Sequence, residues 1–332
     1  MAILDIRNLT TRIPTARGNL TVVDDVSFSV EAGECFGLVG ESGSGKSMTV
    51  KSILGLVPAP GRVTAGSVHH GGRDLTKLPA SAMAAIRGRT IATIVQDAVS
   101  ALNPVYRIGR QIAEPMLEHG LVRSRTEART RAIALMTKVG IPAPEKRIDD
   151  YPHQFSGGMC QRVVIATALS CDPGLILADE PTTALDVTIQ DQILKLLVNL
   201  QQDLGLSLLL VTHDMGVVAQ TCQRVAVMYA GQIVELVRTE DLFRKPRHPY
   251  TAGLLNCVPR LDGPARRLNP IPGAPPDLAS PPTGCRFHPR CPLATEACRA
   301  GNPALREVAP GHFSRCIRQD ALTPDMWEAA DA

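Results

Sequence analysis

The sequence predicts an α/β protein with a largely parallel sheet, a helical insertion in its middle and a cysteine-containing extension near its end. The first observation is a short apolar run, ECFGLVG at 34–40, followed by a glycine-rich loop and a segment with helical spacing of apolar residues. The second is that apolar runs of strand length recur later and are separated by helical patterns. Strands and helices that alternate along the chain are typical of α/β folds.

Three further buried strands are expected at 174–179, 207–213 and 224–231. Between the first two lies an amphipathic helix over 187–205, which ends at a glycine suited to terminate a helix. The apolar face of this helix comprises Ile189, Ile193, Leu197, Leu200 and Leu204. This alternation predicts a parallel sheet covered by helices on both faces.

Two stretches depart from that pattern. From about 97 to 168 the sequence is helical with little strand signal, which predicts a helical insertion. After Lys245 the composition changes, and eight prolines fall between Pro259 and Pro282, too many for a helix or a central strand. We therefore expect a core domain at 1–245 and an extension at 246–332 that begins with an extended connector.

Composition limits the possible functions. Of 332 residues, 44% are hydrophobic, which is enough for a packed core, and the net charge of +3 does not indicate a nucleic-acid binder. No apolar leader segment is evident, and the longest apolar runs are far shorter than the ~20 residues that span a bilayer. We expect a soluble chain in a reducing compartment, where disulfides are disfavoured.

The loop GESGSGKS at 40–47 has the pattern of a phosphate-binding loop, G-x-x-x-x-G-K-[ST]. Its glycines allow successive backbone N–H groups to face phosphate oxygens, and the following helix adds its positive N-terminal end. Lys46 is expected to reach the β- and γ-phosphates, and Ser47 to bind Mg²⁺. The predicted phosphate-binding residues are Gly40, Glu41, Ser42, Gly43, Ser44, Gly45, Lys46 and Ser47.

An acidic pair, Asp179 and Glu180, stands at the end of the strand expected at 174–179, in the motif LILADE. A carboxylate there is costly unless it faces a metal ion or another partner, so Asp179 is expected to help hold Mg²⁺. Glu180 follows directly and is placed to activate a water molecule as a general base. An acidic pair could instead cap the next helix, but the phosphate loop upstream favours the metal-binding interpretation.

Several motifs together resemble those of the ABC family of ATPases. FSGGM at 155–159 resembles that family's signature motif, and TTALD at 182–186 its D-loop. Gln96 in IATIVQD matches its Q-loop, and His213 in VTHD its switch histidine. With the phosphate loop, these motifs stand in the family's order and cover roughly residues 1–245.

The resemblance implies a mechanism. Two ATPase subunits would close head to tail on ATP, with the signature of one subunit facing the γ-phosphate held by the other. Glu180 would be the base, His213 would contact the γ-phosphate, and Gln96 would contact both Mg²⁺ and a transmembrane partner. The signature and D-loop residues expected to contribute to ATP binding are Ser156, Gly157, Gly158 and Asp186.

The chain departs from the common family pattern at four positions. Phe155 and Met159 stand in the signature where leucine and glutamine are commonest, and Ala98 stands where many relatives have proline. Ile13 occupies the neighbourhood in which most relatives carry an aromatic residue that stacks on adenine. These differences leave open how the chain holds adenine.

Three stretches narrow the resemblance to the ATP-binding subunits of bacterial oligopeptide and dipeptide importers, specifically the D-type subunit. They are YPHQFSGGM, RHPYTAGLL at 247–255, and the tail rich in proline and cysteine. The resemblance implies a second, F-type ATPase subunit, two transmembrane permeases and an extracytoplasmic peptide-binding protein. The chain would lie peripherally on the cytoplasmic face of the inner membrane.

Two alternatives stay open at this stage. An importer of the same architecture could carry nickel, glutathione or another small solute, because the ATPase never touches the cargo. A soluble ABC ATPase acting on ribosomes or DNA is disfavoured, because such proteins carry two ATPase units or a long coiled coil. This chain has one phosphate loop and no sustained heptads.

Four cysteines gather in the tail: Cys285, Cys291, Cys298 and Cys316, separated by five, six and seventeen residues. This is not the C-x₂-C spacing of common zinc sites, so incidental buried thiols remain one interpretation. The tail has few apolar residues, so it would need a cross-link, such as a bound metal, to hold one conformation. Four thiolates suit a metal when arginines nearby offset their charge, here Arg286, Arg290, Arg299 and Arg315. Some importer ATPases that this chain resembles carry a [4Fe–4S] cluster here. We expect that cluster, with Zn²⁺ as the alternative, in a structural role.

Overall fold

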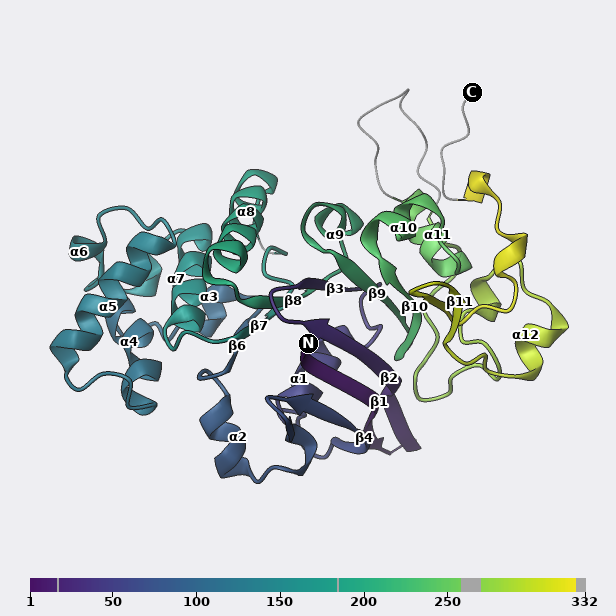
Figure 1. Ribbon diagram of the computed structural model, residues 1–332, viewed down its shortest axis with the longest axis horizontal. Coiled ribbons are helices and arrows are strands. Elements are labelled where there is room, and N and C mark those ends of the chain that lie inside the picture. The colour runs from purple at the N-terminus through teal and green to yellow at the C-terminus, as the bar shows by residue number, and fades with distance from the viewer. Residues whose placement is uncertain (17, 184, 258–269, 327–332) are drawn as a thin grey trace. The chain divides into compact units, whose positions relative to one another are not determined.

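The computed structural model describes residues 1–16, 18–183, 185–257 and 270–326 (Figure 1). These residues form two compact units, each assembled from separate stretches of the chain. Unit 1 comprises residues 1–3, 30–35 and 77–211, and unit 2 comprises 4–29, 36–76 and the described part of 212–332.

Unit 1 contains three parallel strands, in the order β8 (Ser207–Thr212), β7 (Leu175–Asp179) and β6 (Ile91–Ile94). Nearly every residue of these strands is buried, which explains why β7 and β8 appear in the sequence as continuous apolar runs. The register pairs Asp179 with Val211, so the acidic end of β7 lies beside the end of β8. The strands predicted at 174–179 and 207–213 are confirmed.

The predicted helical stretch of unit 1 contains five helices. Of these, α3, α4 and α5 pack on α7, and Figure 1 shows the four helices gathered as one layer. The helices of unit 1 are α2 (Ala80–Ile86), α3 (Ala98–Ala101), α4 (Ile108–Glu118), α5 (Arg125–Lys138), α6 (Pro144–Arg147), α7 (Gly157–Leu169) and α8 (Val187–Leu204), with a 3₁₀ turn at Pro152–Gln154.

Helix α8 follows the sequence prediction closely. Ile193, Leu197 and Leu200 are buried on one face, and Gly205 ends the helix in the left-handed conformation at φ 63°. Leu204, predicted on the same face, is instead 45% exposed, because it lies in the last turn where the helix leaves the core.

Unit 2 begins with an antiparallel sheet that the sequence analysis did not predict. Its order is β2 (Gly18–Glu31), β1 (Ala2–Thr15), β4 (Arg62–His70) and β5 (Arg73–Asp74). Along β1, buried and exposed residues are mixed, because a sheet of this kind has one solvated face. Strands of this kind lack the continuous apolar runs by which the sequence analysis recognised strands, and they were therefore not predicted.

A second group of strands in unit 2 carries the phosphate loop. Its order is β3 (Cys35–Val39), β9 (Arg224–Tyr229), β10 (Gln232–Arg238), β12 (His312–Ser314) and β11 (Arg306–Ala309). Strands β3 and β9 are parallel, as expected, whereas β10, β12 and β11 pair antiparallel. The cysteine-rich tail therefore adds two strands to this sheet, which its proline and glycine content concealed.

The helices of unit 2 cover this sheet and end the chain. They are α1 (Lys46–Ile53), α9 (Met215–Thr221), α10 (Thr239–Arg244), α11 (Pro249–Asn256) and α12 (Glu296–Ala300), with 3₁₀ turns at Leu75–Lys77, His288–Arg290, Gln319–Ala321 and Pro324–Met326. Residues 270–283 contain no helix or strand, as the prolines predict, and the rest of the expected connector, 258–269, lies outside the described residues. The domain division at residue 245 stays a prediction.

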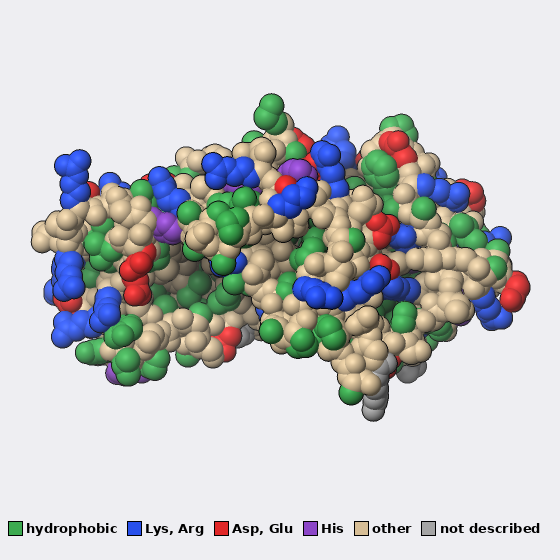
Figure 2. All heavy atoms as spheres, turned by 90° about the horizontal axis from the view of Figure 1, so that it is seen from below, with side chains coloured by type: hydrophobic (Ala, Val, Ile, Leu, Met, Phe, Trp, Pro, Cys, Tyr) green, Lys and Arg blue, Asp and Glu red, His purple; other side chains and the backbone are tan. Residues whose placement is uncertain are grey.

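The surface carries mixed charge. On the face drawn in Figure 2, lysine and arginine side chains occur in small separate groups among hydrophobic, neutral and acidic ones. None of the helices among the described residues has the length and apolar character needed to cross a bilayer. The expectation that the chain binds no nucleic acid stays a prediction.

Candidate active site

The predicted phosphate loop of unit 2 has the backbone that its glycines allow. It leaves the buried strand β3 at Gly40 and enters α1 at Lys46. Gly45 precedes the helix at φ 106°, and a Cβ there would lie 2.4 Å from the carbonyl oxygen of Val22. Only glycine fits this position, because both the φ angle and the close backbone exclude a side chain. The loop therefore brings its N–H groups and the N-terminus of α1 to one place.

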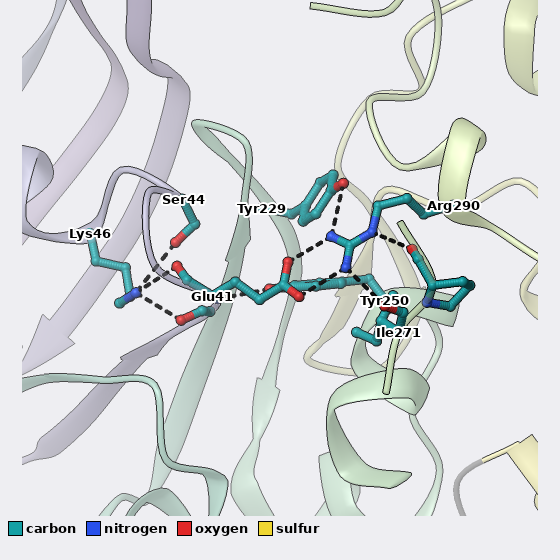
Figure 3. A network of polar contacts seen from close by, with 9 residues as sticks. Glu41, Ser44, Lys46, Tyr229, Tyr250, Ile271 and Arg290 are labelled. Carbon is teal, nitrogen blue, oxygen red and sulfur yellow. Dashed lines mark hydrogen bonds and ion pairs between the residues drawn. The ribbon is translucent and has the colours of Figure 1, made fainter. Parts of the chain in front are cut away.

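Lys46 is buried and its amine points back into the loop (Figure 3). Its Nζ donates to the carbonyl oxygens of Gly40 and Glu41, at 2.7 and 2.9 Å, and lies 3.5 Å from Oγ of Ser44. The ammonium thus stands at the centre of the loop, where an anionic group would meet it. Ser47, the predicted Mg²⁺ ligand, follows in α1 and is half-buried.

Glu41 connects the loop to the rest of unit 2. Its backbone N–H donates to the hydroxyl of Tyr250 at 2.8 Å, and its carboxylate pairs with Arg290 (Figure 3). Burial raises the pKa of Tyr250 well above its usual value, so the hydroxyl stays protonated. Ser42 and Gly43, at the tip of the loop, are exposed.

His213 lies in unit 2 directly after β8 and is exposed. The next residue, Asp214, caps α9 by accepting from the N–H groups of Gly216 and Val217 at 2.7 and 3.4 Å. This cap fixes the turn that carries His213.

Glu180 occupies an unusual backbone conformation in unit 1. It follows Asp179 at the end of β7, its φ is 48°, and its N–H donates to the carbonyl oxygen of Val211 at 2.9 Å. A non-glycine residue in the left-handed region costs about 1 kcal/mol or more, and such residues cluster at functional sites. Both carboxylates of the pair are half-buried.

Two side chains donate to the same carboxylate oxygen of Glu180. Nε2 of Gln96 lies 3.0 Å from Oε2, and Oγ1 of Thr183 lies 2.8 Å from it. Gln96 follows β6 and Thr183 belongs to the D-loop, so three segments of unit 1 converge on the predicted base. Sequence analysis named Gln96 and Glu180 but missed Thr183, which the TTALD motif contained.

The signature segment begins α7. Ser156 caps the helix by accepting from the N–H of Met159 at 3.4 Å, and both Ser156 and Gly157 are exposed. A Cβ on Gly158 would lie 2.6 Å from Cγ2 of Ile189 in α8, so this position requires glycine. The segment thus presents a helix N-terminus and its N–H groups at the surface of unit 1.

Asp186 caps α8 by accepting from the N–H of Ile189 at 2.9 Å. Unit 1 therefore brings together Gln96 and Glu180, and unit 2 brings together Glu41, Ser44 and Lys46. The predicted ATP-binding role of Asp186 stays a prediction.

The four tail cysteines line one small cavity of unit 2, together with His248 and Phe287. These four cysteines, all within the described residues, form no disulfide. Burial, and then the neighbouring thiols, raise the pKa of Cys291 to about 11 and that of Cys316 to about 12. The four side chains are therefore close enough to interact, yet among the described residues no three His, Cys, Asp or Glu side chains are arranged as a metal site.

Three of the four arginines expected near the cysteines pair with carboxylates and do not line the cavity. Arg286 pairs with Asp24 at 2.5 Å, Arg290 pairs with Glu41 at 2.7 Å, and Arg299 pairs with Glu296 at 3.3 Å. Of the four arginines that the sequence suggested, only Arg315 lines the cavity. Arg286 and Arg290 join the tail to carboxylates of the N-terminal part of unit 2, whereas Arg299 pairs within helix α12.

A buried lysine within a glycine loop, and a strand-end carboxylate held by a glutamine, define a phosphate-loop nucleoside triphosphatase. Comparison with known proteins gives the particular family. Residues 23–183 match the ABC transporter family, and residues 234–298 match the C-terminal region of oligopeptide/dipeptide transporters.

Curated relatives extend the similarity over the whole chain. A probable peptide ABC transporter ATP-binding protein of Sinorhizobium fredii is 49% identical over 96% of this chain and 96% of its own. The dipeptide transport ATP-binding protein DppD of Bacillus subtilis is 47% identical over 99% and 98%. DppD of Escherichia coli is 46% identical over 95% and 96%. The chain belongs to the ABC transporter family and is an ABC-type ATPase.

Solved structures agree with the fold. An ATP-binding cassette in a dimeric post-hydrolysis state with ADP and Pi covers 71% of this chain and 98% of its own, with a TM-score of 0.64 and 27% identity. A dimeric bacterial ABC transporter cassette covers 69% and 96%, with a TM-score of 0.62 and 29% identity.

Proposed function

We propose that this chain hydrolyses ATP to power uptake of peptides through a membrane importer. The observation that carries the proposal is similarity over nearly the whole chain to dipeptide transport ATP-binding proteins, including the C-terminal region at 234–298. An importer of nickel, glutathione or another small solute remains the second candidate. The ATPase geometry serves any cargo equally, so transport assays distinguish the two.

The phosphate loop binds the ATP phosphates in this proposal. Its N–H groups and the N-terminus of α1 face the phosphate oxygens, and Lys46 turns its ammonium from the loop carbonyls toward the β- and γ-phosphates. Ser47, Asp179 and Gln96 would hold Mg²⁺, and their hydroxyl, carboxylate and amide oxygens are ligands that this ion prefers. Bound Mg²⁺ would neutralise charge that develops on the phosphates.

Glu180 acts as the general base. Its carboxylate oxygen is oriented by Gln96 and Thr183, which leaves the base in one position when water arrives. His213 would contact the γ-phosphate. Ser156, Gly157 and Gly158 would bind the γ-phosphate held by a second ATPase subunit, with Asp186 near that contact. The exposure of Ser156 and Gly157 supports this assignment.

The permease contact is proposed at a cavity of about 550 Å³ in unit 1. It lies between the residues beside Gln96 and helices α3, α4 and α7, and its lining includes Val95, Leu102 and Tyr106. Val99 and Val105 nearby are 58% and 71% exposed, and apolar side chains gathered beside a cavity are typical of a surface that a partner covers. A short apolar segment of a transmembrane subunit fits this surface.

Similarity to dipeptide transport ATP-binding proteins supports the rest of the proposed assembly. Two permeases, an extracytoplasmic peptide-binding protein and a second ATPase subunit complete the importer, with this chain peripheral at the cytoplasmic face of the inner membrane. The F-type identity of the second ATPase stays a prediction from the sequence resemblance. Val99→Glu should abolish copurification with the permeases, whereas Leu204→Glu, an exposed change on α8, should not.

The tail thiols are proposed to hold a [4Fe–4S] cluster, with Zn²⁺ as the alternative. Cys285, Cys291, Cys298 and Cys316 line one cavity, and four thiols are a donor set that suits either group. Burial raises the pKa values of Cys291 and Cys316, and a bound cation would reverse this by favouring their thiolates. The group would supply a cross-link that fixes the tail.

The proposed cargo is tested by reconstitution. The chain is combined in proteoliposomes with the permeases, second ATPase and binding protein encoded beside it, and uptake of labelled dipeptide, Ni²⁺ and glutathione is measured. We expect ATP-dependent uptake of dipeptide that is lost in Lys46→Ala. Uptake of only Ni²⁺ or glutathione would replace the peptide assignment with the second candidate.

A further inference from the structure

The tail reaches the phosphate loop through one buried arginine. Arg290 lies in the 3₁₀ turn His288–Arg290, between Cys285 and Cys291, and its side chain is 5% exposed. Its Nη1 and Nη2 lie 2.7 and 3.0 Å from the two carboxylate oxygens of Glu41 (Figure 3). This two-bonded geometry is the strongest form of arginine–carboxylate contact and fixes both direction and distance.

The remaining donors of Arg290 are also used. Nε donates to the carbonyl oxygen of Pro272 at 2.9 Å, Nη2 lies 3.4 Å from that of Ile271, and Nη1 lies 3.4 Å from the Tyr229 hydroxyl. The hydrogen bonds to Glu41 are the main cause that raises the pKa of Arg290 above its usual value. The guanidinium therefore stays charged and is held from three sides, so it has little freedom to follow a moving loop.

Glu41 is the residue through which this hold reaches the nucleotide site. Its carboxylate accepts from Arg290, and its backbone N–H donates to the hydroxyl of Tyr250. Its carbonyl oxygen accepts from Nζ of Lys46 at 2.9 Å. The supporting side chains are packed together, since the rings of Tyr229 and Tyr250 lie 4.5 Å apart and those of Tyr250 and Phe287 lie 5.4 Å apart. A shift of the tail would move the carbonyl that orients the phosphate-binding lysine.

We propose that Arg290 is a positioning residue for ATP binding, which holds the phosphate loop through Glu41 and transmits the conformation of the cysteine segment to nucleotide affinity. The proposal rests on the proposed function, since it assumes that this loop binds ATP. The tail then has a role beyond stability, because a change at the four thiols alters the affinity of the phosphate loop for ATP.

The alternative role is structural only. If Arg290 merely fastens the tail, its loss would lower the melting temperature and leave the ATP dissociation constant unchanged. If it positions the loop, the dissociation constant would rise whether Arg290 or Glu41 is changed, and the two changes together would cost no more than either alone, because both break one contact.

The experiment measures binding of a fluorescent ATP analogue to the purified full chain. Arg290→Gln and Glu41→Gln should each weaken binding by about tenfold, within the range typical of coupling between sites, and the double variant should match the single ones. Arg290→Lys keeps the charge but not the paired geometry and should be intermediate. Arg299→Gln, an exposed tail arginine paired with Glu296, should bind as the unmodified chain does.

A second arm links the thiols to the loop. Cys291→Ser should weaken ATP binding in the unmodified chain but not in the Arg290→Gln background. Unchanged binding in both Arg290→Gln and Glu41→Gln, or equal effects of Cys291→Ser in both backgrounds, would overturn the proposal. Failure of the unmodified chain to bind ATP, or unchanged binding in Lys46→Ala, would instead overturn the proposed function.

Discussion

The side-chain amide of Gln96 donates to Oε2 of Glu180 across 3.0 Å, joining the residue after β6 to the residue after β7. Thr183 donates to the same oxygen at 2.8 Å. A carboxylate held by two donors is fixed in one orientation, which is what a positioned proton acceptor requires.

This relationship predicts the effect of losing either donor. Gln96→Ala and Thr183→Val should each lower kcat of the assembled ATPase by about tenfold, the size expected for one hydrogen bond to a charged group. The measurement is steady-state ATP hydrolysis, with Gln202→Ala, an exposed change on α8, as the control. An unchanged kcat in both variants would show that the orientation of Glu180 does not limit the reaction.

The signature glycines differ in how closely they are packed. Gly158→Ala places a Cβ 2.6 Å from Cγ2 of Ile189, a stiff β-branched side chain, and should destabilise the chain by about 1–3 kcal/mol. Gly157→Ala is the matched control, since its Cβ would lie 3.8 Å from Leu185. Urea unfolding measures both, and Ile189→Ala should relieve the penalty of Gly158→Ala. Equal stability of the two glycine variants would contradict this packing.

Much of unit 1 could be predicted from the sequence, and less of unit 2. The strands at 174–179 and 207–213 are buried on both faces and therefore appear as continuous apolar runs. β1 and β2 are partly solvated, and β11 and β12 are very short, so neither pair gives such a run. β1 also pairs with β4, and β12 with β10, and local patterns do not reveal these partners, which lie farther away in the chain.

The candidate site shows the same division. The phosphate loop, Gln96 and Glu180 belong to motifs whose chemistry is visible in the residues themselves. Arg290 was noticed only as one of several tail arginines, because its partner Glu41 lies 249 positions earlier in the sequence. Nothing in the local sequence distinguishes it from Arg299, which is exposed.

Assembly should control activity. The signature of this chain is exposed, and by the proposed mechanism each phosphate loop needs the signature of a second subunit. The purified chain alone should therefore hydrolyse ATP slowly, and its rate should rise steeply when the second ATPase and the permeases are added. Full activity in a dilute monomer would contradict the shared site.

Metal analysis tests the tail. After anaerobic purification we expect visible absorption, with iron and acid-labile sulfide in proportion to protein, and loss of both in Cys316→Ser. Cys257→Ser is the control, because Cys257 is not among the residues lining the cavity. A colourless protein that contains stoichiometric zinc would show that Zn²⁺, and not the cluster, occupies the site. A folded tail without metal would contradict the proposal that a metal cross-links it.

The most direct test of the account is ATP turnover by Glu180→Gln in the assembled importer. Because an amide cannot accept the proton of the attacking water, this variant should bind ATP as the unmodified chain does yet hydrolyse it at least about a hundredfold more slowly. Lys46→Ala, by contrast, should lose binding itself. Hydrolysis by Glu180→Gln at the unmodified rate would contradict the assignment of Glu180 as the base.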